Sequence, residues 1–326
     1  MKKIAGLILA ASKQAAFPTK EVGDITALKR IVLTLNKWGV WPILVVTGFY
    51  EIEVKAELMD QGVIFIQNED NDYPSLQSSI QIGVEYLQDK CDAIMISPVN
   101  IPLYRSSTVR EILGTDGVIV NPSFEGQAGH PVLIEKEMFQ EIVDAEEQEE
   151  GLRTILRNHT NKRRFVDVDD EGILLTVHEE DDIDKFVEKS NQELFQADLR
   201  IMLQKDTVFF DRRMRLLMEQ IEVMQSVQGA CKSMSLSKSK AWKMINELER
   251  QMGYKIVNRR HGGASGGKTM LSEKGKILLT EYKKMEERIF ENLRSEFNQF
   301  AQSIDDTDQL HTKKPKELAK KKLKGE

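Results

Sequence analysis

The residues of this chain that are suited to chemistry follow its short apolar runs. The run 7–11, Leu-Ile-Leu-Ala-Ala, has the composition of a buried strand, and Ser12 and Lys20 come after it. In many α/β proteins a glycine-rich loop at this place binds phosphate through its backbone N–H groups. This loop contains no glycine before Gly23. It therefore either holds a nucleotide in another way or no longer holds one.

Four further polar residues occupy comparable places in the first half of the chain. Asn100 follows the apolar run 93–98, Ser78 and Ser79 lie in a helical pattern, and His130 lies in a glycine–proline turn. One hypothesis is that these four residues, with the two of the first loop, line a cleft for a small molecule. The other is that they form only turns and packing contacts. The pattern assigns no catalytic side chain and no metal ligand.

Short apolar runs alternate with amphipathic helical patterns up to about residue 187, and these elements must position the polar residues. Residues 27–39 carry an apolar stripe at helical spacing that ends at Gly39. The alternation predicts an α/β fold with a mostly parallel, doubly wound sheet, in which ligands bind beyond the carboxyl ends of the strands. The predicted strands are 4–11, 43–47, 63–67, 93–98, 118–121 and 165–168.

The second half of the chain has a different order of elements. Residues 188–210 are predicted to form a helical linker. Residues 211–300 have the pattern of three helices, a β-hairpin and a last helix that begins at Ser272, which is the order of a winged helix-turn-helix domain. The lysine-rich residues 301–326 are predicted to be disordered.

Ten residues of this half are candidates for contact with DNA. The second helix of a helix-turn-helix lies in the major groove, where lysines and hydroxyls near its start suit phosphates and base edges. Cations on a glycine-rich hairpin suit phosphates or the minor groove. Trp242 is in phase with Ile245 and Leu248 and is assigned to the core. The candidates are Ser237, Lys238, Ser239, Lys240, Lys243 and Asn246 on the helix, and Arg259, Arg260, His261 and Lys268 on the hairpin.

Charge separates the two halves as well. Residues 1–204 carry 20 basic and 35 acidic side chains, whereas residues 211–300 carry 18 basic and 11 acidic ones. This asymmetry favours a polyanionic partner, double-stranded DNA, over a winged helix that contacts only protein. Cys91 and Cys231 have no partners at metal spacing, so a disulfide scaffold is excluded. The apolar runs are too short for a signal peptide or a membrane helix, so we expect a cytoplasmic protein without membrane contact.

Residues 5–187 resemble the MobA-like nucleotidyltransferases, which include the molybdenum-cofactor cytidylyltransferases. The resemblance implies a nucleotidyltransferase fold, a nucleotide substrate and Mg²⁺. The matching segments occur in the family's order and are LILAA at 7–11, GDITALKRIVLTLNKWGV at 23–40, LVVTG at 44–48, QSSIQIG at 77–83, DAIMISPVNIPL at 92–103, GHPVLI at 129–134, GLRTIL at 151–156 and DDEGILL at 169–175.

Three departures from the family's pattern fall where the resemblance places phosphate and metal. In the first loop, Ser12 and Pro18 replace glycines, Ala16 replaces an arginine, and Lys20 is the candidate for the lysine. Asn100 replaces an aspartate, and Thr-Val-His at 176–178 replaces an Asp-x-Asp pair. Both changes remove carboxylates that a hard dication prefers. We therefore expect an inactive site without a cofactor, or one that uses Mg²⁺ if the domain is active.

Residues 211–290 resemble the DNA-binding domain of the molybdate-responsive ModE regulators and, more distantly, that of LysR-type regulators. The matching segments are SKAW at 239–242, INELERQMG at 245–253 and VNRRHGGASGGKTMLSEKG at 257–275. The pattern departs from the family at Gln225 and Ser235, which replace glycines in turns.

The two resemblances together imply a transcription regulator whose degenerate nucleotidyltransferase domain is a sensor or scaffold for a small-molecule or nucleotide effector. The alternative is an active nucleotidyltransferase, for molybdenum cofactor or a related NTP transfer, with an autoregulatory DNA-binding domain. The apolar stripe that runs from Leu278 to Phe297 is longer than a small domain can cover, and it predicts a homodimer.

Overall fold

The computed structural model describes residues 2–11, 18–59, 61–69, 75–146, 152–177, 183–197, 199–260 and 268–322. Ser12, His178 and His261, which the sequence analysis singled out, lie outside these ranges. The chain divides into two compact units, Met1–Phe195 with Val223–Lys243, and Gln196–Glu222 with Met244–Glu326. Residues 1–195 are called the front domain below, and residues 196–326 the C-terminal region.

The front domain is built on one sheet with the strand order β10-β7-β9-β6-β1-β4-β5, to which β8 adds by pairing with β7. Strands β6, β1, β4 and β5 are mutually parallel neighbours, and β7 is parallel to β10. The predicted α/β fold with a mostly parallel sheet is confirmed. The strands are β1 (Ile4–Ala10), β4 (Ile43–Thr47), β5 (Ile64–Gln67), β6 (Ala93–Pro98), β7 (Ile119–Phe124), β8 (Gln127–Ala128), β9 (Val132–Glu135) and β10 (Arg163–Asp167).

Strand β9 was not predicted, and it runs antiparallel to both β6 and β7. The sequence analysis treated its segment as a turn or packing element. Val132, Leu133 and Ile134 are buried in the middle of the sheet. A short continuous apolar run fits a buried strand but carries no period that would show its direction.

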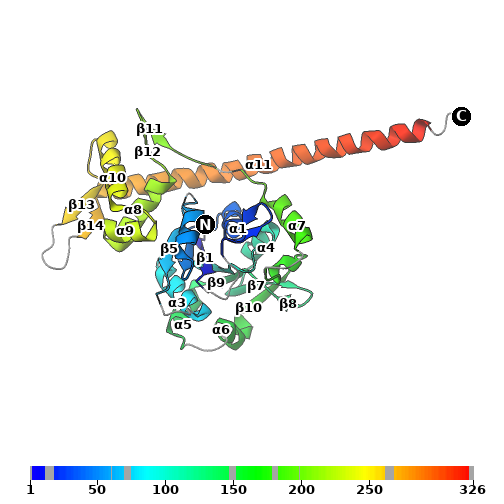
Figure 1. Cartoon of the computed structure of the whole chain (residues 1–326), viewed down its shortest axis with the longest axis horizontal. Coiled ribbons are helices and arrows are strands. Elements are labelled where there is room, and N and C mark those ends of the chain that lie inside the picture. Colours follow the sequence, from blue (N-terminus) through cyan, green and yellow to red (C-terminus); the bar gives the residue numbers. More distant parts are fainter. Residues whose placement is uncertain are drawn as a thin grey trace. The chain divides into compact units, whose positions relative to one another are not determined.

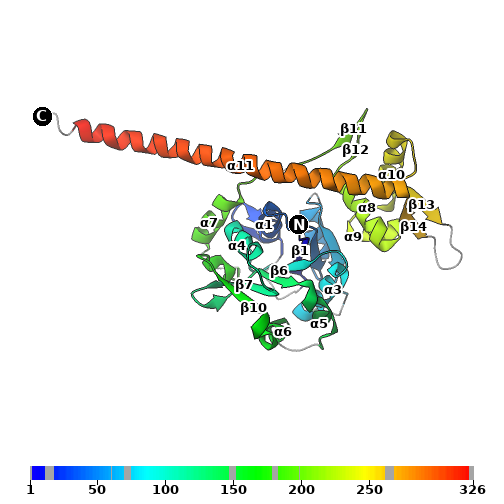
Figure 2. The same cartoon turned by 180° about the vertical axis from the view of Figure 1, so that it is seen from behind.

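Helices cover both faces of the sheet. Figures 1 and 2 show α1, α4 and α7 on one side and α3, α5 and α6 on the other. Side chains of a strand alternate between faces; accordingly, Leu7 of β1 abuts Gly83 of α3, whereas Ile8 packs in the cluster that contains Leu28 and Ile31 of α1. The helices are α1 (Ala27–Lys37), α2 (Glu51–Leu58), α3 (Leu76–Leu87), α4 (Ser106–Leu113), α5 (Phe139–Asp144), α6 (Leu152–Asn158) and α7 (Asp184–Leu194).

Short elements complete the front domain. A small hairpin of β2 (Glu21–Val22) and β3 (Ile25–Thr26) precedes α1, whose N-terminus is capped by Thr26. The predicted end of this helix is confirmed, because Gly39 adopts a φ of 74° directly after it. The 3₁₀ turns are η1 (Lys136–Met138), η2 (Thr160–Lys162) and η3 (Glu171–Ile173).

The prediction of a helical linker over residues 188–210 is correct only as far as Leu194, where α7 ends. Beyond it, β11 (Leu203–Gln204) and β12 (Val208–Phe210) form an antiparallel pair. The turn between them is held to α10 by Asp206, which pairs with Arg250 at 3.2 Å. Residues 208–210 are Val-Phe-Phe, β-branched and aromatic residue types that favour a strand over a helix.

The C-terminal region continues with helices, a hairpin and a long helix. These are α8 (Arg212–Met224), α9 (Val227–Ser233), α10 (Lys238–Met252), β13 (Val257–Arg260), β14 (Lys268–Leu271) and α11 (Glu273–Lys322). The predicted start of the last helix is confirmed, since the Ser272 hydroxyl accepts a hydrogen bond from the Gly275 N–H at 3.0 Å.

The predicted disordered tail differs from the structure, in which α11 continues to Lys322 (Figure 2). Residues 317–322 are rich in lysine, alanine, leucine and glutamate, which have high helix propensity, whereas the prediction weighed only low complexity. Over the described ranges, no helix combines the length and the apolar composition that crossing a membrane requires.

Candidate functional site

The carboxyl ends of four adjacent parallel strands form the edge at which ligands of such sheets bind. These strands end at Ala10, Thr47, Gln67 and Pro98. The chain after β4 lies directly against the chain after β1, because a Cβ atom on Gly48 would lie 2.3 Å from the Ala11 carbonyl oxygen. Only glycine fits this close approach of two backbones.

Two of the predicted pocket residues, Ser78 and Ser79, are brought together at the start of α3. Asn68, which the sequence analysis missed, donates from Nδ2 to the Ser78 hydroxyl at 2.8 Å and to the Ser79 hydroxyl at 3.0 Å. Both hydroxyls in turn donate to the Ser75 carbonyl oxygen, at 3.1 and 3.0 Å. Ser79 and Asn68 are buried. These polar groups therefore join the end of β5 to α3.

Asn100 lies beside the segment in which the second metal carboxylate was expected. The Val177 N–H donates to the Asn100 carbonyl oxygen at 2.8 Å. The backbone of Asn100 is therefore next to that of Val177, the middle residue of the segment in which the resemblance expects an Asp-x-Asp pair. A neutral amide at 100, with Thr176 and Val177 opposite, gives Mg²⁺ no carboxylate from these three positions.

His130 is held differently from the other predicted pocket residues. Its N–H donates to the Ile173 carbonyl oxygen at 3.0 Å, and Nδ1 is buried without a hydrogen-bond partner. Burial, reinforced by the positive charge of Arg153, lowers the pKa of His130 to about 4. The imidazole is therefore neutral at pH 7, and it is enclosed by the protein.

Lys20 precedes the β2–β3 hairpin, where its carbonyl oxygen accepts from the Ala27 N–H at 2.8 Å. The sequence analysis missed Arg30 of α1, which is fully buried. Arg30 donates to the Val22 carbonyl oxygen at 2.6 Å and to the Ser190 hydroxyl of α7 at 3.0 Å. Burial lowers the pKa of Arg30 to about 10. The negative charge of the nearby Asp24 acts in the opposite direction but is the smaller effect.

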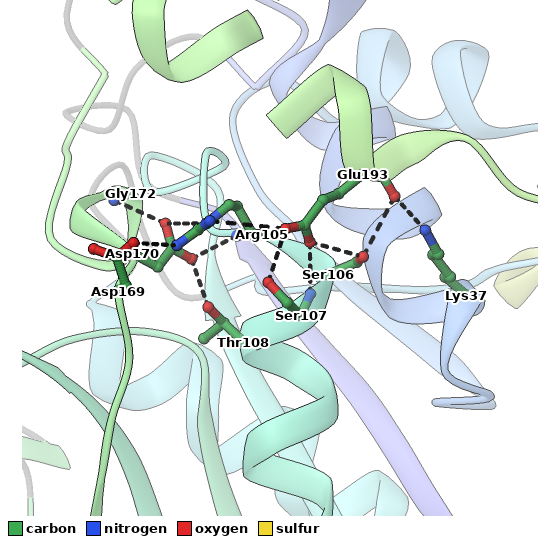
Figure 3. A network of polar contacts seen from close by, with 9 residues as sticks. All are labelled: Lys37, Arg105, Ser106, Ser107, Thr108, Asp169, Asp170, Gly172 and Glu193. Carbon is green, nitrogen blue, oxygen red and sulfur yellow. Dashed lines mark hydrogen bonds and ion pairs between the residues drawn. The ribbon is translucent and has the colours of Figure 1, made fainter. Parts of the chain in front are cut away.

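A polar network beside the carboxyl edge joins the start of α4 to the end of α7 (Figure 3). Asp170 accepts from the Arg105 N–H at 2.7 Å, the Thr108 hydroxyl at 2.6 Å and the Gly172 N–H at 3.1 Å. Burial raises the pKa of Asp170 above its ordinary value, although these hydrogen bonds and the Arg105 charge act in the opposite direction. Arg105 reaches Asp170 at 3.5 Å and Glu193 at 3.9 Å.

Glu193 of α7 is the second carboxylate of this network. It accepts from the Ser107 N–H at 2.7 Å, the Ser107 hydroxyl at 2.9 Å and the Ser106 hydroxyl at 3.1 Å. Lys37 of α1 donates to the carbonyl oxygens of Glu193 and Phe195, at 2.5 and 3.1 Å. A carboxylate at a helix N-terminus is favoured by the unsatisfied N–H groups there, so α4 and α7 are tied end to end.

Two hollows of the front domain are lined by residues other than the predicted pocket residues. One of about 490 Å³ is lined by α3, α5 and α6 residues that include Gln77, Glu141 and Thr154. The other, of about 250 Å³, is lined by residues that include Phe124 and Glu171. In the part of the chain that the structure describes, no group of three or more His, Cys, Asp or Glu side chains is arranged to hold a metal ion.

The predicted DNA-contact residues of α10 are exposed. Ser237 caps this helix through its hydroxyl, which accepts from the Lys240 N–H at 3.2 Å. The burial pattern corrects one assignment, because Ala241, Ile245 and Leu248 are fully buried whereas Trp242 is half-buried. The exposed candidates on or next to the helix are Ser237, Lys238, Ser239, Lys240, Lys243 and Asn246.

Of the four candidates on the hairpin, three lie within the described residues and one does not. Arg259 and Lys268 are exposed on β13 and β14, and Arg260 is the register partner of Lys268. His261 lies outside the described ranges. Turns flanking α9 adopt the left-handed conformation at Gln225 and Ser235, with φ values of 48° and 50°. These are the two positions at which the resemblance expects glycine.

Comparison with known proteins supports the first of the two resemblances. Residues 18–163 match the family described as MobA-like NTP transferase domain. No curated protein matches the chain.

Three solved structures similar to this chain have sequence identities well below a quarter and TM-scores below 0.5. A protein from Mycobacterium tuberculosis H37Rv, Rv0371c in complex with manganese, is 18% identical over 51% of this chain and 88% of its own, with a TM-score of 0.45. A nucleotidyl transferase from Methanothermobacter thermautotrophicus is 16% identical over 59% and 98%, with a TM-score of 0.48. A 4-diphosphocytidyl-2C-methyl-D-erythritol synthase from Anaerococcus prevotii is 14% identical over 58% and 96%, with a TM-score of 0.48.

Proposed function

We propose that the front domain binds a nucleoside triphosphate at the carboxyl edge of its sheet but transfers the nucleotidyl group poorly, and that the C-terminal region binds double-stranded DNA. One observation carries the first half of this proposal. Asn100, within the residues that match the MobA-like NTP transferase domain, lies beside Val177. This contact supports an edge at which the two segments that would hold a metal lie together, and Asn100, Thr176 and Val177 provide no carboxylate to it.

Poor transfer follows from the charge of the reacting groups. Nucleotidyl transfer concentrates negative charge on the phosphates, and a divalent cation held by carboxylates usually neutralises it. The amide of Asn100 offers only a neutral oxygen, and Thr176 offers a hydroxyl. Both are weak ligands for a hard dication. Nucleotide binding then depends on cations of the chain, of which Lys20 follows the first strand.

The second candidate function is an active nucleotidyltransferase that uses Mg²⁺. A feature of the sequence favours it: residues 179–182, Glu-Glu-Asp-Asp, directly follow the positions at which the carboxylates are missing. A shift of the metal ligands by a few positions would restore a charged site. The metal dependence of nucleotide affinity separates the two candidates without requiring the acceptor substrate to be known.

The test is isothermal titration of the full-length protein with CTP and GTP, in Mg²⁺ and in EDTA. We expect affinities that change less than about threefold on removal of the metal, and Asn100→Asp should become metal-dependent without gaining nucleotidyl transfer. A wild-type protein that binds nucleotide only with Mg²⁺ would favour the active enzyme. An absence of binding to either nucleotide would exclude both candidates.

The DNA-binding half rests on the exposed cations of α10 and of the hairpin. Lys238, Lys240 and Lys243 follow one another at the exposed start of a helix, the position that base and phosphate contacts require in a helix-turn-helix. The left-handed backbone at Gln225 and Ser235 gives independent support, because the resemblance to ModE places glycines there. A regulator of this kind acts in the cytoplasm.

A homodimer is part of the same proposal. Leu279 and Tyr282 at the start of α11 are buried. The Tyr282 ring packs against the Phe210 ring, with 4.5 Å between the ring centroids. Further along the helix, Ile289 and Phe300 are 38% and 53% exposed. Exposed apolar side chains along a helix favour pairing with a second copy. Sedimentation of the full-length protein tests this; a monomer at all concentrations would contradict it.

A further inference from the structure

Strand β10 forms one edge of the sheet of the front domain. It pairs with β7 on one side, and in the described part of the chain no strand pairs with its other side. The strand at the opposite edge, β5, is buried over its first two residues. In β10, by contrast, Arg164, Phe165 and Asp167 are exposed. An exposed edge strand offers its free backbone N–H and C=O groups to another strand.

Alternate residues of β10 direct their backbone groups to the free side. The Val168 N–H, directly after the strand, donates to the Ser123 carbonyl oxygen of β7 at 2.9 Å. In a parallel ladder the residues that bond to one neighbour are two apart, so Arg164 and Val166 also bond to β7. The residues that direct their N–H and C=O groups away from β7 are Arg163, Phe165 and Asp167.

The side chains of Arg163, Phe165 and Asp167 share one face of the sheet, because side chains alternate along a strand. Phe165 is 51% exposed. The Arg163 guanidinium lies 4.8 Å from the centroid of the Phe165 ring and donates to the Asn121 side-chain oxygen at 3.1 Å. Val166, on the opposite face, packs against the apolar core. The open face therefore has an exposed ring with a cation on one side and a carboxylate on the other.

The order of charges along β10 is complementary to itself. In an antiparallel pair of two β10 strands about a two-fold axis at Phe165, residue 163 of each copy lies opposite residue 167 of the other. Arg163 then faces Asp167 at both ends, and the two Phe165 rings face each other. Opposite charges and aromatic rings directly across two strands are stabilising pairs. The same three residues direct their backbone groups to the free side, so main chain and side chains favour one register.

We propose that two copies of the front domain pair through β10, antiparallel and centred on Phe165, so that their sheets become continuous. The partner is a second copy, because one strand provides both members of each ion pair. Edge strands that avoid pairing often carry lysines, prolines or bulges. Strand β10 carries none of these, and its charges attract a second copy. The pairing depends neither on the proposed nucleotide and DNA ligands nor on α11.

Cross-linking of the full-length protein tests this pairing. Phe165→Cys places a thiol on the two-fold axis, where opposite Cα atoms lie about 5.5 Å apart, so a short bis-maleimide should join two copies. Asp89→Cys, at an exposed position shortly after α3, is the control and should not be joined. The native Cys91 and Cys231 are buried, and burial raises the pKa of both thiols, so the wild type should not react.

Charge reversals in the Phe165→Cys protein test the register. Either Arg163→Asp or Asp167→Arg places like charges opposite each other, and each should lower the cross-linked fraction by about fivefold or more. The two reversals together restore opposite charges and should restore most of the cross-linking. Asp167→Arg is the more specific single change, because Arg163→Asp also removes the hydrogen bond to Asn121.

Hydrogen exchange of the charge variants with Phe165 intact gives a second measurement. The amides of residues 163 and 165 should exchange faster in Asp167→Arg than in the wild type, and at the wild-type rate when both charges are reversed. Cross-linking of Phe165→Cys no greater than that of Asp89→Cys would overturn the pairing. Equal exchange at these amides in Asp167→Arg and the wild type would overturn it too, as would a loss of cross-linking that the double reversal does not restore.

Discussion

The polar residues singled out in the front domain and those singled out in the C-terminal region have different surroundings. Ser78 and Ser79 are tied to Asn68 and to a backbone carbonyl, and His130 has an enclosed Nδ1. Lys238 and Lys243 are exposed on one helix. Polar residues after a buried strand are close to the core, where the fold itself requires hydrogen bonds. Changes in the front domain should therefore alter stability, and changes on α10 or the hairpin should alter binding.

The largest effect is expected at Gly48, where the comparison predicts a loss of stability. In Gly48→Ala the new Cβ would meet the Ala11 carbonyl oxygen at 2.3 Å, and neither backbone can yield without disturbing a central strand. The free energy of unfolding should fall by about 3 kcal/mol, the scale of overpacking in a core. Gly114→Ala is the control, since its Cβ meets nothing closer than 3.5 Å. Equal denaturation midpoints for the two variants would contradict this packing.

The next effect concerns DNA and should leave stability unchanged. Replacing Arg259 and Lys268 by alanine removes two proposed phosphate contacts, so binding to every sequence should weaken alike. The slope of log K against log salt should flatten by about 0.9 for each contact. Loss of both contacts should weaken the DNA affinity roughly a hundredfold at 50 mM salt. Lys276→Ala is the control, an exposed lysine that pairs with Glu273 on α11. Unchanged slopes would contradict contacts between the hairpin and the DNA phosphates.

The exposed residues of α10 should behave differently from the hairpin. Lys240, Lys243 and Asn246 are proposed to lie nearer the base edges, where a good contact discriminates by roughly 1–3 kcal/mol. Their replacement by alanine should erode the preference for an operator over scrambled DNA more than it weakens binding to scrambled DNA. Selected-sequence binding followed by competition titration measures this preference. Identical behaviour of the helix and hairpin variants would contradict the division of roles.

His130 predicts a dependence of stability on pH. Its pKa is lowered to about 4 in the folded chain, whereas the unfolded histidine keeps an ordinary pKa near 6.5. The unfolded state therefore gains a proton first as the pH falls, and stability declines between pH 6.5 and 4 by about 2.5 kcal/mol. Urea titrations should show a flatter decline for His130→Asn.

The smallest effect is expected at Ser235, between α9 and α10. A non-glycine residue at a φ of 50° is strained, and Ser235→Gly should raise the free energy of unfolding by about 0.5–1 kcal/mol. Ser233→Gly, within α9 two residues earlier, should instead destabilise, because glycine is unfavourable in a helix. Destabilisation by both changes would show that the left-handed backbone at Ser235 is not strained.

Periodicity and apolar runs were sufficient to predict the sheet, because its parallel strands are short, buried and separated by amphipathic helices. The same reasoning missed β9, since a strand of four residues shows neither its direction nor its partners. It placed Trp242 in the core because helical phase alone cannot distinguish a fully buried position from a neighbouring half-buried one.

The candidate site could be predicted only in part, for a related reason. Asn100 and the segment 176–178 were identified through resemblance, and the structure places Asn100 beside Val177. Arg30 bonds to Ser190 and Glu193 bonds to Ser107 across long stretches of the chain. A single sequence contains no signal for such pairs, because each partner alone resembles an ordinary surface residue of an amphipathic helix.

The most direct test of the central claim is to locate bound nucleotide on the front domain. Hydrogen exchange of the full-length protein, with and without saturating CTP or GTP, measures protection segment by segment. The proposed site predicts slower exchange in residues 18–24 and 99–105 and around Val177, with little change in α5 and α6. Protection confined to α5 and α6, around the hollow lined by Gln77 and Glu141, would contradict a nucleotide site at the carboxyl edge.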